Sequence, residues 1–298
     1  MSPPTTKEER PYCTPFDEAE LKAVEQRVRT TMVVQEKPSM LVIDWGCDEA
    51  HGAPQEMVLE DGSGHGGSLR IARFQWQPGG RVTIRRIASS HYYQPGVVIE
   101  HAEVSATQLA PMIATSRVAL LARPHVVRLK SKNGSYVHGM SSTNDFHVLL
   151  RIADDGGRVT ENHFSGYESS RAMDHIVPMR LATEPIRKLI DGLTLVKAEP
   201  TDDDRAFFTA RLIRTLATKP FWWVKERYVA NAAAFGTVDA IPMLVALMQE
   251  KGEASADRTR VHALDALTAI TGWDPRVDGA RKRSIDEAAE LAKEACAL

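Results

Sequence analysis

Apolar residues recur at helical spacing through almost all of residues 201–298. A repeat of three or four residues is the signature of helices with one buried face. It predicts helices over residues 202–218, 221–235, 239–250, 257–271 and 284–296. Thr201 is a suitable cap for the first of these, because its hydroxyl can accept from the first turn and Asp202–Asp204 favour the positive end of a helix.

Residues 16–198 show a different pattern, in which short runs with strand alternation predominate. Predicted strands cover residues 40–45, 69–76, 82–87, 97–104, 126–131, 135–140, 146–152 and 158–165. Predicted helices cover residues 15–28, 106–121 and 181–193. Turn residues at 78–80, 133–134 and 154–157 join neighbouring strands as hairpins, which indicates a mostly antiparallel sheet.

The two patterns meet at Glu199-Pro200. We therefore predict an α+β domain over residues 16–198, preceded by a disordered leader over 1–15, and an all-helical domain over 201–298. Within the first domain, residues 44–67 are expected to form an acidic loop. A chain of 298 residues is long enough to bury a core in each domain.

The helical pattern of the C-terminal part contains an internal repetition. Ala230, Ala233 and Gly236 recur 36 residues later as Ala266, Ala269 and Gly272. A period of this size is typical of helical hairpins that stack through small residues. Stacked hairpins generally present a surface to a partner and carry out no chemistry of their own.

The segment 226–247 resembles a HEAT-like helical repeat. Its alanine-rich first helix ends at Gly236, a short turn contains Asp239, and the second helix begins near Ile241-Pro242. Residues 258–272 resemble the first helix of a following unit, so the resemblance covers about one and a half repeats. It departs from the pattern where Trp273-Asp274-Pro275-Arg276 replaces the short turn. The resemblance implies binding of a protein partner and supplies no catalytic residue.

Aromatic residues cluster at the start of this repeat, in Phe221-Trp222-Trp223 and Tyr228. One interpretation is that they form a core, and the other is that they bind a partner, because Trp and Tyr provide large rigid contact surfaces. The residues expected to contact a protein partner are Trp222, Trp223, Tyr228 and Trp273. The basic residues at 276 and 281–283 are expected to form a solvated loop.

Basic residues also accumulate on the predicted strands of residues 66–132. An alternative function is therefore binding of nucleic acid or another anionic ligand through Arg81, Arg85, Arg128 and Lys130. Two other interpretations stay open: the acidic segment 44–61 folds over these strands and neutralises them, or the arginines line a solvated sheet face.

Composition excludes several functional classes. The apolar share of 43% and charged share of 26% are ordinary for a globular protein, and a net charge of −2 gives no overall attraction to nucleic acid or membranes. Three widely separated cysteines argue for a reducing compartment. With no signal peptide and no apolar run long enough for a membrane span, we expect a cytoplasmic protein that does not bind membranes.

Candidate chemistry is weak. The ten histidines include His91, His101, His138, His147 and His163 near predicted strands, but none shows the spacing of a metal site. Ser141 and Ser142 lie close to Asp145 and His147 without a nucleophile elbow. The sequence therefore favours a noncatalytic interaction or scaffold module with no cofactor and no metal, and leaves the oligomeric state open.

Overall fold

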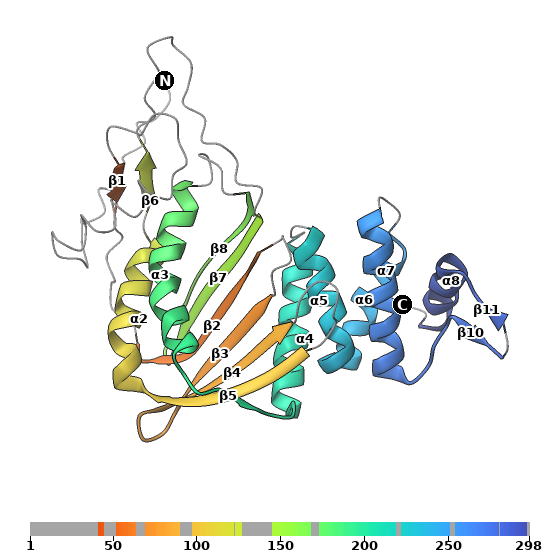
Figure 1. Ribbon diagram of the computed structural model, residues 1–298, viewed down its shortest axis with the longest axis horizontal. Helices are drawn as coiled ribbons and strands as arrows, with labels where there is room; N and C mark the ends of the chain where they lie inside the picture. Colours follow the sequence, from red (N-terminus) through yellow and green to blue (C-terminus); the bar gives the residue numbers. More distant parts are fainter. Residues whose placement is uncertain are drawn as a thin grey trace, which may run out of the picture. The chain divides into compact units, whose positions relative to one another are not determined.

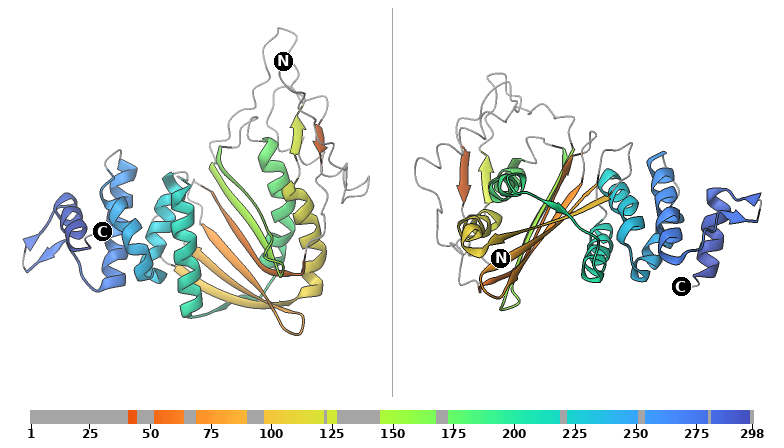
Figure 2. Two further views of the ribbon diagram at one scale, coloured as in Figure 1. Left: turned by 180° about the vertical axis from the view of Figure 1, so that it is seen from behind. Right: turned by 60° about the horizontal axis from the view of Figure 1, so that its bottom comes forward.

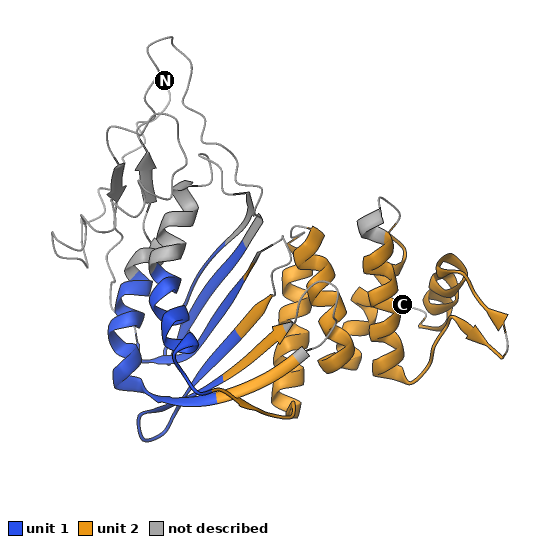
Figure 3. Cartoon of the chain, viewed as in Figure 1, with its two compact units in different colours: residues 1–61, 72–84, 102–194 blue, residues 62–71, 85–101, 195–298 orange. Residues whose placement is uncertain are grey.

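The computed structural model describes residues 41–44, 52–63, 69–89, 97–121, 123–126, 145–167, 173–218, 222–250, 254–279 and 281–296. Their fold is α+β, as predicted. The chain divides into two compact units (Figure 3). The first comprises residues 1–61, 72–84 and 102–194, and the second comprises residues 62–71, 85–101 and 195–298. The second unit thus joins the helical C-terminal part to segments of strand.

Seven strands form one sheet in the order β8-β7-β2-β3-β4-β5-β9 (Figure 1). Their bounds are β2 Pro54–Ser63, β3 Arg70–Gln77, β4 Arg81–Ser89, β5 Val97–Ser105, β7 Asp145–Asp154, β8 Val159–Tyr167 and β9 Val196–Lys197. β8 pairs with β7, and β9 with β5, in antiparallel register. A separate antiparallel pair joins β1, Leu41–Asp44, to β6, Arg123–Val126. The expected hairpin over residues 126–140 lies outside the described residues from 127 on, as does the whole helix expected over 15–28.

Two helices of the first unit, α2 (Ala106–Leu121) and α3 (Met173–Asp191), pack against each other and against β8 (Figure 2). Ser116 closes their interface, because its buried hydroxyl donates to the carbonyl of Ala182 at 2.9 Å. The helix predicted at 181–193 begins earlier than expected. The stretch before residue 181 contains Pro178, and a proline is normally disfavoured inside a helix.

The prediction of an acidic loop over residues 44–67 is wrong for residues 54–63, which form strand β2. The carboxylates of this strand are compatible with a sheet because cations from other elements bind them. Glu56 contacts Arg73 at 2.9 Å and Arg151 at 2.8 Å. The buried Glu60 lies 3.0 Å from His147 Nε2, and Asp61 lies 2.9 Å from the Arg187 guanidinium of α3. These partners are far away in sequence, so the local pattern did not predict the strand.

The helices of the second unit match the predicted segments closely. They are α4 Asp202–Ala217, α5 Trp222–Phe235, the short 3-10 helix η1 Val238–Ala240, α6 Ile241–Met248, α7 Ala254–Thr271 and α8 Ile285–Ala295. α5 packs between α4 and α7, and α6 contacts both α7 and α8. Their core contains Phe208, Phe235 and Leu267, all buried, and the Phe208 and Phe235 rings lie 5.1 Å apart.

Small residues allow α5 and α7 to approach closely. Ala232, Ala263 and Ala266 are fully buried. At Gly236, the first residue after α5, an added Cβ would lie 2.7 Å from Ile270 Cδ1 and 2.6 Å from the Ala232 carbonyl oxygen. Both distances are shorter than real Cβ contacts, so this position requires glycine. The alanine and glycine periodicity in the sequence thus includes a genuine close contact between the end of α5 and α7.

A buried ion pair connects strand β4 to the first turn of α4. The Arg85 guanidinium donates to both carboxylate oxygens of Asp204, and its Nε lies 3.1 Å from Oδ1. The same carboxylate accepts from the N–H and hydroxyl of Thr201, each at 2.9 Å, which completes a capping box. Burial by itself would raise the pKa of Asp204, but the hydrogen bonds from Arg85 and Thr201 outweigh burial and lower it.

We predict that Gly236→Ala lowers the free energy of unfolding by about 1–3 kcal/mol, the usual penalty for overpacking. Urea denaturation followed by circular dichroism measures this value. Adding Ile270→Val removes the Cδ1 methyl that the new Cβ would meet, so the double variant should recover part of the loss. A Gly236→Ala chain as stable as the parent would show that α5 and α7 are not closely packed here.

We also predict that Asp204→Ala lowers the free energy of unfolding by about 3–5 kcal/mol, because it leaves the part-buried Arg85 guanidinium without its carboxylate and removes the Asp204 half of the capping box. Asp202→Ala, on the exposed side of the same turn, should change it little.

The lowered pKa of Asp204 gives this contribution a defined pH dependence. The stabilisation is fully present above the pKa of an unfolded aspartate, about 3.9, and disappears as the pH falls through the lower folded value. Unfolding free energies measured between neutral and acidic pH should therefore fall more steeply below about pH 4 in the parent than in Asp204→Ala. Identical slopes in the two proteins would contradict the assigned role of the pair.

Candidate functional site

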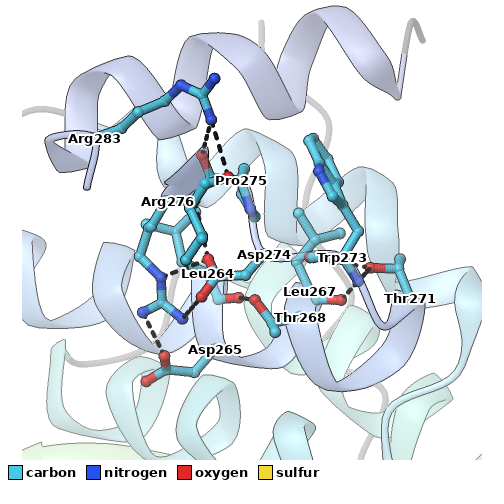
Figure 4. Close-up of polar contacts among 11 residues, drawn as sticks. Leu264, Asp265, Leu267, Thr268, Thr271, Trp273, Asp274, Pro275, Arg276 and Arg283 are labelled. Carbon is cyan, nitrogen blue, oxygen red and sulfur yellow. Dashed lines mark hydrogen bonds and ion pairs between the residues drawn. The ribbon is translucent and has the colours of Figure 1, made fainter. Parts of the chain in front are cut away.

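The connection between α7 and α8 is the candidate site, a loop whose own residues hold it together (Figure 4). It begins at Gly272, whose φ of 74° is the left-handed conformation that commonly ends a helix. The Gly272 N–H donates to the Thr268 carbonyl at 2.8 Å. The chain thus leaves α7 through a capped end and turns back along the helix.

Arg276 is the central residue of this loop. Its guanidinium donates to Asp274 Oδ1 at 2.8 Å and Oδ2 at 3.1 Å, and to Asp265 Oδ1 of α7 at 2.6 Å. The hydrogen bond from Arg276 is the main cause that lowers the pKa of Asp274, and the same bond is the main cause that raises the pKa of Arg276. One arginine therefore fixes the loop to the preceding helix in a bidentate geometry that lysine does not offer.

A second arginine, Arg283, fixes the far side of the loop. Its backbone N–H donates to the Arg276 carbonyl at 2.8 Å. Its guanidinium donates to the carbonyls of Pro275 and Val277 at 3.2 and 3.3 Å, and to Asp278 Oδ2 at 2.6 Å. These bonds hold a short hairpin of β10, Val277–Asp278, and β11, Arg281–Lys282. The basic loop is therefore not simply solvated as expected, because each of its three arginines contacts a carboxylate of the protein.

Trp273 projects from this scaffold. Its backbone N–H donates to Thr271 Oγ1 at 3.1 Å, and Thr271 donates in turn to the Leu267 carbonyl at 2.8 Å. The indole is partly exposed and points away from the Asp274–Arg276 pair (Figure 4). Val277 on the same loop is 51% exposed. The loop thus presents two apolar side chains on a backbone with little freedom to move.

A second partly exposed tryptophan, Trp222, lies at the start of α5. This residue is 40% exposed, and the Arg258 guanidinium carbon of α7 lies 5.7 Å from the centroid of its ring. The Arg258 Nε is 3.3 Å from both oxygens of the buried Glu226 carboxylate, and His262 Nε2 is 4.0 Å from Oε1. Trp222 and Glu226, four residues apart, share one face of α5, so the carboxylate positions the cation over the indole.

The other two residues predicted to contact a partner lie inside the helical core. Trp223 is 2% exposed, and Tyr228 is fully buried. Successive helix residues point about 100° apart, so Trp222 and Trp223 cannot both face the same side. The structure therefore assigns Trp223 and Tyr228 to packing, which agrees with the core interpretation of the aromatic cluster, and leaves Trp222 and Trp273 with surface for a partner.

The residues proposed for anion binding do not form one basic patch in the described part of the chain. Arg85 binds the buried Asp204, whereas the exposed Arg81 lies 3.8 Å from Glu103. Arg128 and Lys130 fall outside the described residues. Among the neighbouring arginines, Arg73 contacts Glu56, which agrees with the interpretation that the acidic segment neutralises these strands, and Arg86 contacts Glu100 at 2.6 Å.

Sequence reasoning missed the residues that organise the site, Arg258, Asp265 and Arg276. The close spacing of Asp274 and Arg276 around Pro275 was the one local signal for the loop. Asp265 lies a full eleven positions before Arg276, and Arg258 lies 32 positions after Glu226, so no short motif joins them.

Searches for other chemistry gave negative findings within the described ranges. No group of three or more His, Cys, Asp and Glu side chains there is placed to hold a metal ion. None of the helices that the structure describes combines the length and apolarity needed to cross a membrane. Comparisons with protein-family models, curated proteins and solved structures found no match for the chain.

We predict that Arg276→Ala loosens the loop while the helices stay folded, because the replaced contacts lie at a partly exposed position. Hydrogen–deuterium exchange of residues 272–283 should become faster, with little change in α4 and α5. Arg281→Ala is the matched control, since Arg281 is an exposed arginine of the same loop whose contact, with Glu287 at 2.8 Å, does not involve α7. Unchanged exchange in Arg276→Ala would show that the contacts of Arg276 with Asp265 and Asp274 do not hold the loop in place.

Proposed function

We propose that this protein is a noncatalytic interaction module that binds a protein partner through the helical part of its second unit, with Trp222 and Trp273 as apolar anchors. The observation that carries the proposal is the Trp273 loop. Its indole is partly exposed, yet the surrounding backbone is fixed by Thr271, Arg276 and Arg283. A folded monomer gains little from rigidly presenting an apolar ring to water.

Interface energetics support the same assignment. Tryptophan is enriched among residues whose truncation weakens binding most. Ordering side chains and loops on association opposes binding, so a loop that is already ordered retains more of its contact energy. Trp222 adds a second ring, which Arg258 and Glu226 hold in place. Both tryptophans belong to the second unit.

The HEAT-like character of this region is part of the proposal. In such an array, equivalent helices of successive units stack upon one another. The packing of α5 against α7, and of α6 against α8, has this order. The α7–α8 loop, where the sequence departs from the repeat pattern, then corresponds to an insertion at one face of the array, a place where repeat proteins frequently bind partners.

Anion binding is the less supported alternative. Arg73, Arg85 and Arg86 are each within hydrogen-bond distance of a carboxylate. A phosphate would have to compete with those carboxylates. The outcome of the experiment below separates the two functions.

We predict that the full chain, used as bait in a native lysate, retains a stoichiometric protein partner after nuclease treatment. Trp273→Ala and Trp222→Ala should each reduce the recovered partner by about tenfold or more, the usual effect of truncating a hot-spot residue. Val238→Ala is the control, because Val238 is another exposed apolar residue of the same unit, 65% exposed, outside both anchors.

Two results would contradict the proposal. Recovery that disappears with nuclease would favour nucleic-acid binding, and Arg81→Glu would then be the variant to examine. A partner retained equally by both tryptophan variants would place the interface elsewhere. Arg276→Ala provides a further check, since it should weaken binding while Trp273 itself is still present.

A further inference from the structure

In the part of the chain that the structure describes, β8 and β9 are the outer strands of the seven-stranded sheet, and they differ greatly in length. β9 has 2 residues, including the exposed Lys197, whereas β8 has 9 residues. β8 contains neither lysine nor proline, and its register with β7 is unbroken from Asp145↔Tyr167 to Ala153↔Val159. Natural proteins usually protect an outer strand by keeping it short, charged or bulged. β9 has the first two of these features, and β8 is long and regular.

The pairing with β7 determines which backbone groups of β8 point outward. The Asp154 N–H donates to the Arg158 carbonyl at 3.0 Å, which sets the phase of the antiparallel ladder. Alternate residues exchange hydrogen bonds with β7, and the residues between them direct their N–H and C=O groups away from it. Val159, Glu161, His163 and Ser165 are in the second set. A bond from the His163 N–H to Asn162 Oδ1, at 2.9 Å, confirms that this N–H is directed away from β7.

We propose that β8 pairs antiparallel with β8 of a second copy of this chain, about a twofold axis at Asn162. In this register Glu161 of each copy stands opposite His163 of the other, and Val159 stands opposite Ser165. All four positions have outward backbone groups, so each opposed pair can exchange two hydrogen bonds.

Charge complementarity selects the second copy as the occupant. Directly opposed side chains in a sheet lie on the same face and within reach of each other. The twofold register therefore places one carboxylate beside one imidazole, twice. Glu161 lies 3.8 Å from Arg151 on that face, and His163 is exposed there. A dimer of this kind uses the same strand on both subunits and is closed by its twofold axis, so it adds no third copy at β8.

One local bond changes on pairing. The His163 N–H exchanges the Asn162 side chain for the Glu161 carbonyl of the second copy, so no backbone donor is lost. In the single chain the Asn162 side chain accepts a hydrogen bond from this N–H.

The first test is the molar mass of the full chain over a concentration series, measured by size-exclusion chromatography with light scattering. The parent should pass from one to two chains per particle. His163→Pro removes an N–H that does not bond to β7, so the fold of the single chain is kept. Because the dimer is twofold symmetric, the substitution removes two intermolecular hydrogen bonds, one from each copy. We expect its dimer dissociation constant to rise by about tenfold or more. A parent that stays monomeric throughout, or a dimer that His163→Pro does not weaken, would overturn the proposal.

The second test reports the register and does not depend on the proline variant folding. In a chain with Cys13, Cys47 and Cys296 replaced by Ser, Asn162→Cys places two thiols in a directly opposed pair, about 4.5 Å apart at Cα. Mild oxidation should give a disulfide-linked dimer. Thr160→Cys is the matched control, because residue 160 stands opposite residue 164 of the second copy and should remain reduced. Cross-linking of Thr160→Cys as readily as Asn162→Cys would overturn the proposed register.

Discussion

The helical part of the second unit begins at one buried carboxylate. Asp204 accepts hydrogen bonds from Arg85 of strand β4 and from the N-cap residue Thr201, so the same side chain completes the capping box of α4 and attaches the helix to the strand. A carboxylate that is 2% exposed is stable only if its charge is compensated, which Arg85 does. The position of α4 in turn supports α5, against which it packs. The helices that carry Trp222 and the Trp273 loop therefore start from the Arg85–Asp204 ion pair, a polar contact.

Close packing of the helices then fixes the position of α7 and of the loop that follows it. Gly236 lets the end of α5 approach α7, and α7 ends in a left-handed glycine that directs the chain into the Trp273 loop. The loop is then closed by Arg276, which reaches back to Asp265 on α7. Each step fixes the backbone that the next one uses. The backbone of Trp273, at the end of this series, is held in place by these contacts within the second unit.

Local periodicity was sufficient to predict the helices of residues 202–296, the hairpin turns at 78–80 and 154–157, and the fold class. It was insufficient wherever the stabilising partner is distant in sequence. β2 looked like an acidic loop because Glu56 and Glu60 are satisfied by Arg151 and His147 on another hairpin. The aromatic cluster could be located, but which tryptophan is buried depends on how α5 packs against its neighbours. The contact between Arg276 and Asp265 likewise depends on a turn that returns the chain to α7.

The distribution of charge supports the proposal that apolar side chains bind the partner. Arginines of the described ranges repeatedly contact carboxylates, in both units: Arg73, Arg85, Arg86, Arg151, Arg187, Arg258, Arg260, Arg276, Arg281 and Arg283. An arginine already held by a carboxylate attracts a further anion only weakly, because the two charges cancel at a distance. The net charge of −2 has the same effect over the whole chain. Trp222 and Trp273 remain as the large rigid surfaces whose burial by a partner would lower the free energy most.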